Sequence, residues 1–433
     1  MFNFFKKSQS KDSAAKESHE NATAKFEASE YSAALGILVD GFRKDIEYKP
    51  LYQLAGDCLS KMGAPEESKL FYQASKSPNA ASFQELGYHF YNSGHYPLAK
   101  IFLSEVFKTK KELDIANTLS IAYARRFETQ KAQETLEEVK DDFDFWGFWF
   151  FVKLKILNND RTDLEPLIQE LERIIDARRG DEGWELPTQK VIEVRESHDR
   201  LLSVETPEAI IRDWHYIQYG SLILDFFFDD SQYVAGGRHV ASWGNKESIK
   251  IILLQLIHLL ESKAIDKIVY ANDRDSEIIG LTLSLLMDKP ASAYDPSVKY
   301  SDALLVAAES STFNHFEGVE FIDSNIAFSF CQNWLESTYI CPDIVGLMAQ
   351  TYVFPWGEGN FKFNEDGSSS RQGADEREAL AIAREIAQQE VEKEGSIDPF
   401  YNWVSDHLKM NQNSGHRYNF MTESPVPGSY FGQ

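Results

Sequence analysis

Small side chains recur at near-constant intervals through the first third of this chain of 433 residues. Ala34, Ala99 and Ala132 are each followed four residues later by a leucine. Another small residue stands twelve positions before each of these alanines, at Ala22, Gly87 and Ser120. Two antiparallel helices can approach closely only where small residues meet, and a single pair cannot bury its own apolar face. The pattern therefore predicts a stack of helix pairs.

A fourth unit fits between the first two, with Ala55 as the small residue, Glu67 in place of the alanine and Phe71 as the large residue. The units then recur at roughly 33 residues, close to the ~34 residues of a tetratricopeptide repeat (TPR). The clearest unit, FQELGYHFYNSGHYPLAKIFLSEV, has small and large residues in that family's places: Phe83, Leu86, Gly87, Phe90, Tyr96, Ala99 and Leu103. On these residues, the segment from 15 to about 145 resembles TPR repeats.

The resemblance implies a concave groove, lined by the first helix of each unit, that binds an extended segment of a partner. The side chains expected to face this groove are Lys49, Tyr52, Gln84, Tyr88, Tyr91, Asn92, Asn117 and Arg125. Tyrosines beside amides suit peptide binding, because a tyrosine offers a large area and a hydroxyl at low entropic cost. Alternatively, these tyrosines pack between units or against the second half of the chain. The aromatic segment from Phe143 and the helix predicted at 162–179 resemble a degenerate closing pair.

Net charge and cysteine content reduce the number of function classes that fit this chain. The formal net charge of −24 disfavours nucleic acid and anionic lipid, both of which are bound mainly through cationic side chains. Three scattered cysteines make neither a disulfide framework nor a zinc site, and they suit a reducing cytoplasm. No segment has the roughly 20 consecutive apolar residues of a membrane-spanning helix. We expect a cytoplasmic protein without a metal site or cofactor.

The second half alternates between helical and strand patterns. Helices are predicted at 206–226, beginning at Thr206 and Pro207, and at 245–263, 276–288 and 326–338. Strands are predicted at 231–243, 265–272, 290–294, 302–310 and 319–323. Strands separated by helices indicate a mostly parallel sheet covered on both faces. Residues 360–376 are predicted to be a polar, mobile loop, and helices are predicted to follow at 375–395 and 398–410.

Polar residues follow two of these strands, where open α/β sheets bind ligands. The possible ligand-binding residues are Asp273, Arg274, Asp275, Ser276, Glu309, Ser310 and Ser311. Arg238 and His239, after two glycines, form a second candidate anion site. The layout faintly resembles phosphoribosyltransferases over residues 235 to 330, but that family's Thr-Gly loop is missing. Asp275 or Ser276 as an ordinary helix N-cap needs no ligand.

The predicted fold class is a multidomain one: an all-α TPR-like solenoid, then a three-layer α/β/α (Rossmann-like) domain with a helical tail. The predicted boundaries are 1–14 (disordered), 15–180 (solenoid), 181–205 (linker), 206–358 (α/β domain), 359–410 (mobile loop and helical tail) and 411–433 (disordered or docked). The favoured function is a protein-interaction scaffold or adaptor. In this reading the α/β domain is a docking or ligand-sensing module, and no residue is assigned as catalytic. The alternative is a phosphoribosyltransferase-like or nucleotide- or sugar-phosphate-binding enzyme.

Overall fold

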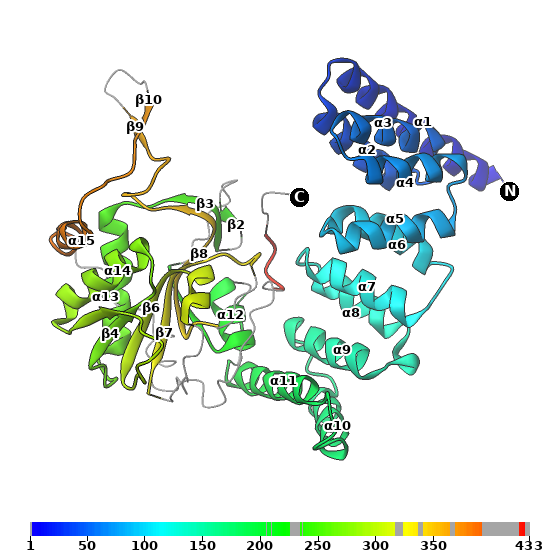
Figure 1. Ribbon diagram of the computed structural model, residues 1–433. Helices are drawn as coiled ribbons and strands as arrows, with labels where there is room; N and C mark the ends of the chain where they lie inside the picture. Colours follow the sequence, from blue (N-terminus) through cyan, green and yellow to red (C-terminus); the bar gives the residue numbers. More distant parts are fainter. Residues whose placement is uncertain are drawn as a thin grey trace. The chain divides into compact units, whose positions relative to one another are not determined.

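The computed structural model divides the chain into two compact units, Met1–Asn158 and Asn159–Gly432 (Figure 1). The described residues are 2–204, 206–208, 210–225, 234–235, 237–316, 324–336, 341–363, 369–391 and 424–428. The two units correspond to the helical and the alternating halves of the sequence. The individual domain boundaries inferred from the sequence stay predictions.

The first unit is a stack of helix pairs. Its helices are α1 (Phe2–Glu27), α2 (Tyr31–Lys44), α3 (Lys49–Lys61), α4 (Pro65–Lys76), α5 (Ala80–Asn92), α6 (Tyr96–Phe107), α7 (Leu113–Ala124), α8 (Thr129–Glu137) and α9 (Phe145–Leu157), with a short 3-10 turn, η1 (Lys140–Asp142). Each odd-numbered helix up to α7 packs against the next helix in the chain, and successive pairs stack through α2–α3, α4–α5, α6–α7 and α8–α9. The predicted series of helix pairs is confirmed.

The turn inside each pair repeats with the helices. One residue has positive φ in each turn: Ser29, Gly63, Gly94 and Phe127. The amide of the residue that follows donates to the carbonyl five positions back, for example from His95 to Phe90 at 2.7 Å. This is the closing hydrogen bond of a Schellman motif, which ends a helix on a left-handed residue. Each pair is thus closed by the same backbone device.

The repeat register of the second pair differs by one residue from the predicted register. In α3 and α4 the crossing residues are Gly56 and Ser68, and the Ser68 hydroxyl donates to the Gly56 carbonyl at 2.8 Å. The large residue four positions later is Tyr72, and a Cβ on Gly56 would lie 2.6 Å from its ring. In the third pair Gly87 faces Leu103 in the same way. The crossing pair assigned to Ala55 and Glu67 was therefore one residue early.

Aromatic rings fill the centre of the first three pairs. The cluster consists of Phe42, Tyr52, Phe71, Phe83, Phe90 and Phe102, all buried. Phe102 lies within 6.4 Å, between ring centroids, of each of the other five rings. Contacts between Phe42 and Phe102 also join α2 to α6, four helices later in the chain. We call these six residues the ring cluster.

The second unit begins with three helices, α10 (Leu164–Ala177), α11 (Glu185–Ser203) and α12 (Ile211–Tyr219). Helix α11 occupies most of the segment predicted to be a linker. The single helix predicted at 206–226 is wrong. Helix α12 begins only at Ile211 and ends at Gly220, which has φ 64. The apolar residues that follow form a strand, β1 (Leu222–Asp225), which pairs with a buried neighbour.

Eight strands of the described residues form one sheet, in the order β2-β3-β8-β7-β6-β4-β5, with β1 also paired to β8. Their bounds are β1 (Leu222–Asp225), β2 (Val234–Ala235), β3 (Arg238–Trp243), β4 (Lys267–Tyr270), β5 (Ala291–Ala293), β6 (Ala303–Glu309), β7 (Ile326–Gln332) and β8 (Ile344–Val353). All pairings are parallel except β2 with β3. The predicted α/β domain is confirmed.

Strands β7 and β8 occupy the middle of the sheet, and neither was predicted. Residues 326–338 were expected to be a helix, but Ile326–Gln332 is a strand in which every residue is buried. A short, continuously apolar run does not distinguish a buried helix from a strand buried on both faces. The strand predicted at 319–323 lies outside the described residues.

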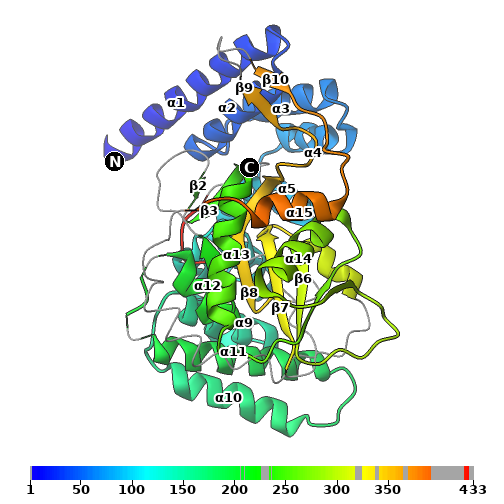
Figure 2. The ribbon, with the colours of Figure 1, turned by 90° about the vertical axis from the view of Figure 1, so that its left-hand side faces the viewer.

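Helices α13 (Lys246–Leu260) and α14 (Arg274–Met287) cover one face of the sheet, and α15 (Ala379–Ala387) packs against both helices (Figure 2). Asn245 caps α13 in a capping box with Ser248. Aromatic residues cover part of the other face, where Phe313 and Phe316 of the 3-10 segment η2 (Ser310–Phe316) pack with Tyr294 and Tyr300.

The segment predicted as a polar loop contains two short strands, β9 (Phe361–Phe363) and β10 (Ser369–Arg371). They pair antiparallel in a ribbon of their own (Figure 1). The predicted helix at 375–395 is shorter, because α15 spans Ala379–Ala387. The helix predicted at 398–410 lies outside the described residues. From the predicted tail 411–433, residues 424–428 are described, and Val426 among them is buried.

Candidate functional site

Several of the predicted partner-binding residues lie on the first helices of two neighbouring pairs. Helix α5 carries Gln84, Tyr88, Tyr91 and Asn92, helix α7 carries Asn117, and Arg125 follows α7 directly. We call these six residues the first-helix surface. None of them is fully buried. Helices α5 and α7 are in contact, so the residues of this surface belong to adjoining elements.

Contacts order the first-helix surface. The Tyr88 side chain hydrogen-bonds to Thr118 of α7, and burial raises the pKa of Tyr88. Lys110 donates to the Gln84 side-chain oxygen at 3.2 Å. The Asn117 side-chain oxygen is buried, yet it has no hydrogen-bond partner among the described residues. A buried acceptor without a donor costs roughly 1–3 kcal/mol of stability.

The other two predicted groove residues lie at the start of α3 and have different environments. Tyr52 is fully buried in the ring cluster, and its hydroxyl donates to the Ile46 carbonyl at 2.5 Å. Burial, reinforced by Asp45, raises the pKa of Tyr52. The structure thus places Tyr52 in the core, where it holds the turn between α2 and α3. Lys49 is exposed, and its ammonium donates to the Lys76 carbonyl at 3.3 Å.

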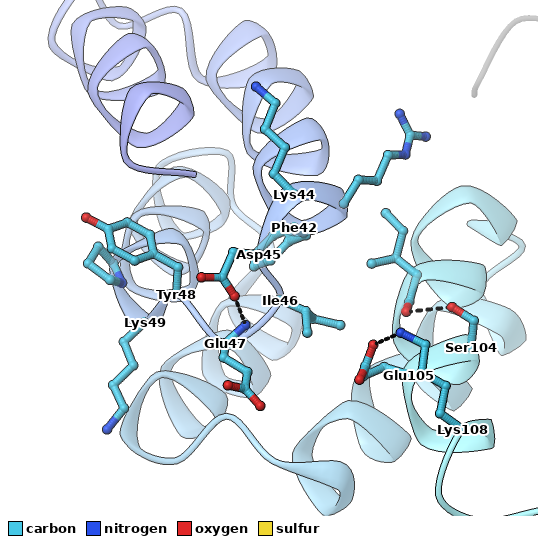
Figure 3. Close-up of a pocket in the computed structure, with 13 residues that line it drawn as sticks. Phe42, Lys44, Asp45, Ile46, Glu47, Tyr48, Lys49, Ser104, Glu105 and Lys108 are labelled. Atoms are coloured by element: carbon cyan, nitrogen blue, oxygen red, sulfur yellow. Dashed lines mark hydrogen bonds and ion pairs between the residues drawn. The ribbon is translucent and has the colours of Figure 1, made fainter. Parts of the chain in front are cut away.

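Lys49 also lines a hollow of about 910 Å³ between the α2–α3 turn and the last turns of α6 (Figure 3). Lys44, Asp45 and Glu47 lie on one side of it and Ser104, Glu105 and Lys108 on the other. The lining thus carries both signs of charge, which suits a polar segment of mixed charge. Sequence reasoning missed this α2–α6 hollow, because it depends on two elements some 60 residues apart.

At the carboxyl end of β4, the predicted ligand residues are held by the chain itself. Asp273 caps α14 and accepts from the Ser276 amide at 2.9 Å. Arg274 donates to the carbonyls of Asp375 and Arg377, the latter at 2.7 Å. Asp275 accepts from the Trp356 indole at 2.6 Å. These contacts join the strand–helix turn to the segment before α15. The N-cap predicted at Asp275 or Ser276 is thus wrong by two or three residues, because Asp273 caps α14.

The predicted residues near the carboxyl end of β6 are also held by hydrogen bonds within the chain. The buried Ser276 hydroxyl accepts from the Ala308 amide at 2.8 Å, which fixes α14 to β6. The hydroxyl of Ser310, also buried, accepts from the Asn333 amide at 3.3 Å. Ser311 is partly buried in η2. Burial raises the pKa of Glu309, and the nearby carboxylates of Asp275 and Glu336 add to the effect. The predicted residues of β4 and β6 are therefore brought together.

An open cavity of about 560 Å³ lies beside the β4 turn. Asn272, Asp273 and Arg274 line it from one side and Arg377 from the other. Arg377 is paired with Asp375 at 2.6 Å and with Glu385. Three further acids, Glu277, Glu376 and Glu378, complete the charged lining. Both arginines already have partners, so the cavity offers little net attraction for a phosphate.

Arg238 is fully buried, unlike the exposed anion-binding residue that the sequence suggested. Its guanidinium donates to the carbonyl oxygens of Val426 at 2.8 Å and Pro427 at 3.0 Å. The Trp334 ring lies 5.9 Å from its centre. Burial lowers the pKa of Arg238 to about 9. His239, the next residue, is half-buried, and burial lowers its pKa.

Two buried polar residues near this end of the sheet were not predicted. His215 of α12 is 1% exposed, and neither ring nitrogen has a hydrogen-bond partner among the described residues. Burial, with a contribution from Arg238, lowers the pKa of His215 to about 3. Gln332, the last residue of β7, is fully buried, and its amide is likewise unpartnered in the described chain. No sequence motif marks either residue, because both depend on tertiary burial.

Within the described parts of the chain, no cluster of three or more His, Cys, Asp or Glu is arranged to hold a metal ion. The helices that the structure describes include none with the length and apolar character needed to cross a membrane.

Comparisons with known proteins give matches among solved structures but no family. No family model matches the chain, and no curated protein matches it. One similar solved structure is the C-terminal part of a TPR repeat-containing protein from Cytophaga hutchinsonii. It is 17% identical, with a TM-score of 0.27, over 44% of this chain and 77% of that one. The TPR-like description of the first unit rests on its own helix pairs, with their repeated turns and small crossing residues.

Proposed function

We propose that this protein is a protein-interaction scaffold that binds a partner segment on the first-helix surface. The observation that carries the proposal is that Gln84 and Tyr88 of α5 and Asn117 of α7 are only partly buried on two helices in contact. Tyr88 offers aromatic area, and the two amide side chains offer polar groups beside it. A partner segment would pack on Tyr88 and hydrogen-bond to these amides.

In the α/β unit, by contrast, three of the predicted ligand residues hold elements of the chain together. Asp273, Arg274 and Asp275 each hydrogen-bond within the chain. These contacts support a docking or ligand-sensing role for the unit rather than catalysis. The enzyme alternative keeps one supporting observation, the cavity of about 560 Å³ at the β4 end.

A substitution that separates binding from folding tests the scaffold proposal. Asn117→Leu removes the unsatisfied acceptor, so the variant should melt at the wild-type temperature or above it. It should also lose the partners that the wild type captures from cell extract, measured by quantitative mass spectrometry. Gln73→Leu, on the exposed face of α4, is the matched control and should keep them. Tyr88→Ala should weaken the same partners by roughly 2 kcal/mol. Unchanged capture by both Asn117→Leu and Tyr88→Ala would refute the assignment.

A further inference from the structure

Residues 424–428, with the sequence Ser-Pro-Val-Pro-Gly, pack into the α/β unit although they belong to no helix or strand. Ser424 and Val426 are buried. Within the segment, the Val426 amide donates to the Ser424 hydroxyl at 3.1 Å. The two prolines have no N–H group, so at these positions the backbone has no donor that needs an acceptor. The segment is therefore held by its fit to a site rather than by a ladder of backbone bonds.

The site is built around a buried cation. Arg238 stands at the start of β3, and its guanidinium donates to two successive carbonyls, those of Val426 and Pro427. Trp334, almost fully buried, lies against the same guanidinium. Hydrogen bonds from a charged donor are stronger than neutral ones, and two from one group specify the course of the bound backbone. This is how a peptide-binding site recognises a chain without regular structure.

Gly428 makes the fit selective for sequence. A Cβ on this residue would lie 2.3 Å from the Arg238 terminal nitrogen, closer than any real Cβ contact. Because the guanidinium is fully buried, it has little room to move aside. The site therefore requires glycine immediately after the second proline.

We propose that the α/β unit contains a peptide-binding site for a Pro-Val-Pro-Gly segment, occupied here by the chain's own residues 424–428. The occupant leaves and returns as a unit, and a separate peptide of the same sequence replaces it. The segment is joined to Gln389 and Glu390 after α15 only through residues 391–423, so its docking is an intramolecular binding event. Because segment and site belong to one chain, the segment stays near the site at a raised effective concentration, which keeps the site filled in the wild type.

A displacement experiment in the full-length protein tests this. The probe is a fluorescein-labelled peptide of residues 420–431, FMTESPVPGSYF, and binding is followed by fluorescence anisotropy. Gly428→Val drives the tethered segment from its site, so this variant should bind the peptide at least tenfold more tightly than the wild type does. The control is Gly373→Val, at an exposed glycine with no atom near its Cβ position, and it should behave as wild type. A peptide carrying the same Gly428→Val change should not bind.

Two results would overturn the proposal. One is a folded Gly428→Val protein, with wild-type circular dichroism, that does not bind the peptide. The other is equal binding of the two peptides. If Gly428→Val does not fold, amide hydrogen exchange of the wild type in increasing urea tests whether the segment leaves its site separately. The Val426 amide should then exchange through a local opening with little urea dependence, while β3 and β7 exchange only through global unfolding. If the Val426 amide and the amides of β3 and β7 all show the same urea dependence, the segment does not leave its site separately, and the proposal is wrong.

Discussion

At the scale of single residues, the distance between two paired helices is set by whether a Cβ is present. A Cβ on Gly87 would lie 2.6 Å from the Leu103 side chain and 3.3 Å from the Leu103 backbone nitrogen. Gly36, in the middle of α2, has nothing within 4 Å of its Cβ position. The two glycines stand in helices of the same unit, so they separate the effect of packing from that of helix propensity.

Alanine at these two positions should therefore change stability in opposite directions. Gly87→Ala is expected to lower the free energy of unfolding of the first unit by about 1–3 kcal/mol, because α5 and α6 are forced apart. Gly36→Ala should raise it by about 1 kcal/mol, because alanine is the better helix former. Urea unfolding followed by circular dichroism measures both. A stabilising Gly87→Ala would contradict the crossing that we describe.

His215 should make the second unit sensitive to mild acid. Its folded pKa of about 3 lies below the unfolded value of about 6.5, so the unfolded chain binds the proton more readily. Stability from this residue is complete above pH 6.5 and declines as the pH falls toward 3, by about 2 kcal/mol between pH 7 and pH 5.

The comparison with His215→Gln isolates this effect. Asp275 and Glu309 have raised pKa values and act in the opposite direction as the pH falls, and they are present in both proteins. Thermal melts at pH 7 and pH 5 should show a smaller decline for His215→Gln than for the wild type. Equal declines would mean that His215 has the same pKa in the folded and the unfolded chain.

At the scale of elements, the helix pairs could be predicted because their contacts are local and repeat in the sequence. The one slip, at Ala55, arose where two small residues are adjacent, and only the Tyr72 contact shows that Gly56 is at the crossing. Strands β1 and β7 were both expected to be helical. Both lie in short apolar runs, where the choice between helix and strand depends on pairing with β8, which is distant in sequence.

The ring cluster makes the first three helix pairs one packing unit. Phe102 is fully buried among five other rings, so Phe102→Ala is expected to cost about 3–5 kcal/mol of unfolding free energy. Phe148→Ala, at a partly exposed ring in α9, should cost less than half as much. Calorimetry measures both. Similar costs would show that the cluster has relaxed around the cavity.

At the scale of the whole molecule, the two functions considered for the α/β unit predict different melting behaviour. Arg274→Ala should lower the melting temperature of the unit, because it releases the carbonyls before α15. Nucleotides and sugar phosphates should leave the wild-type melting temperature unchanged. If one of them stabilises the wild type but not Arg274→Ala, the enzyme alternative is favoured, since a ligand at 100 times its dissociation constant adds about 2.7 kcal/mol.

The candidate sites could be predicted only in part, and the reason is physical. Residues at the ends of β4 and β6 were predicted to meet because carboxyl ends of parallel strands share an edge, and they do. The environment of Arg238 could not be predicted, because its partners lie 188 and 189 positions away. The burial of Tyr52 could not be predicted for the same reason. It packs against Phe42 and Phe83, which belong to other helix pairs.

The position of β8 in the sheet affects how the protein folds during its synthesis. It pairs with β1, β3 and β7, yet it is the last strand of the sheet to be synthesised. A ribosome therefore releases seven of the sheet's eight strands, and three of them (β1, β3 and β7) still lack their shared partner, before the residues of β8 emerge. The helix pairs, whose contacts are local, can fold as they leave the exit tunnel. Newborn copies of the protein should thus need chaperones for one half only, during the interval before residue 353 appears.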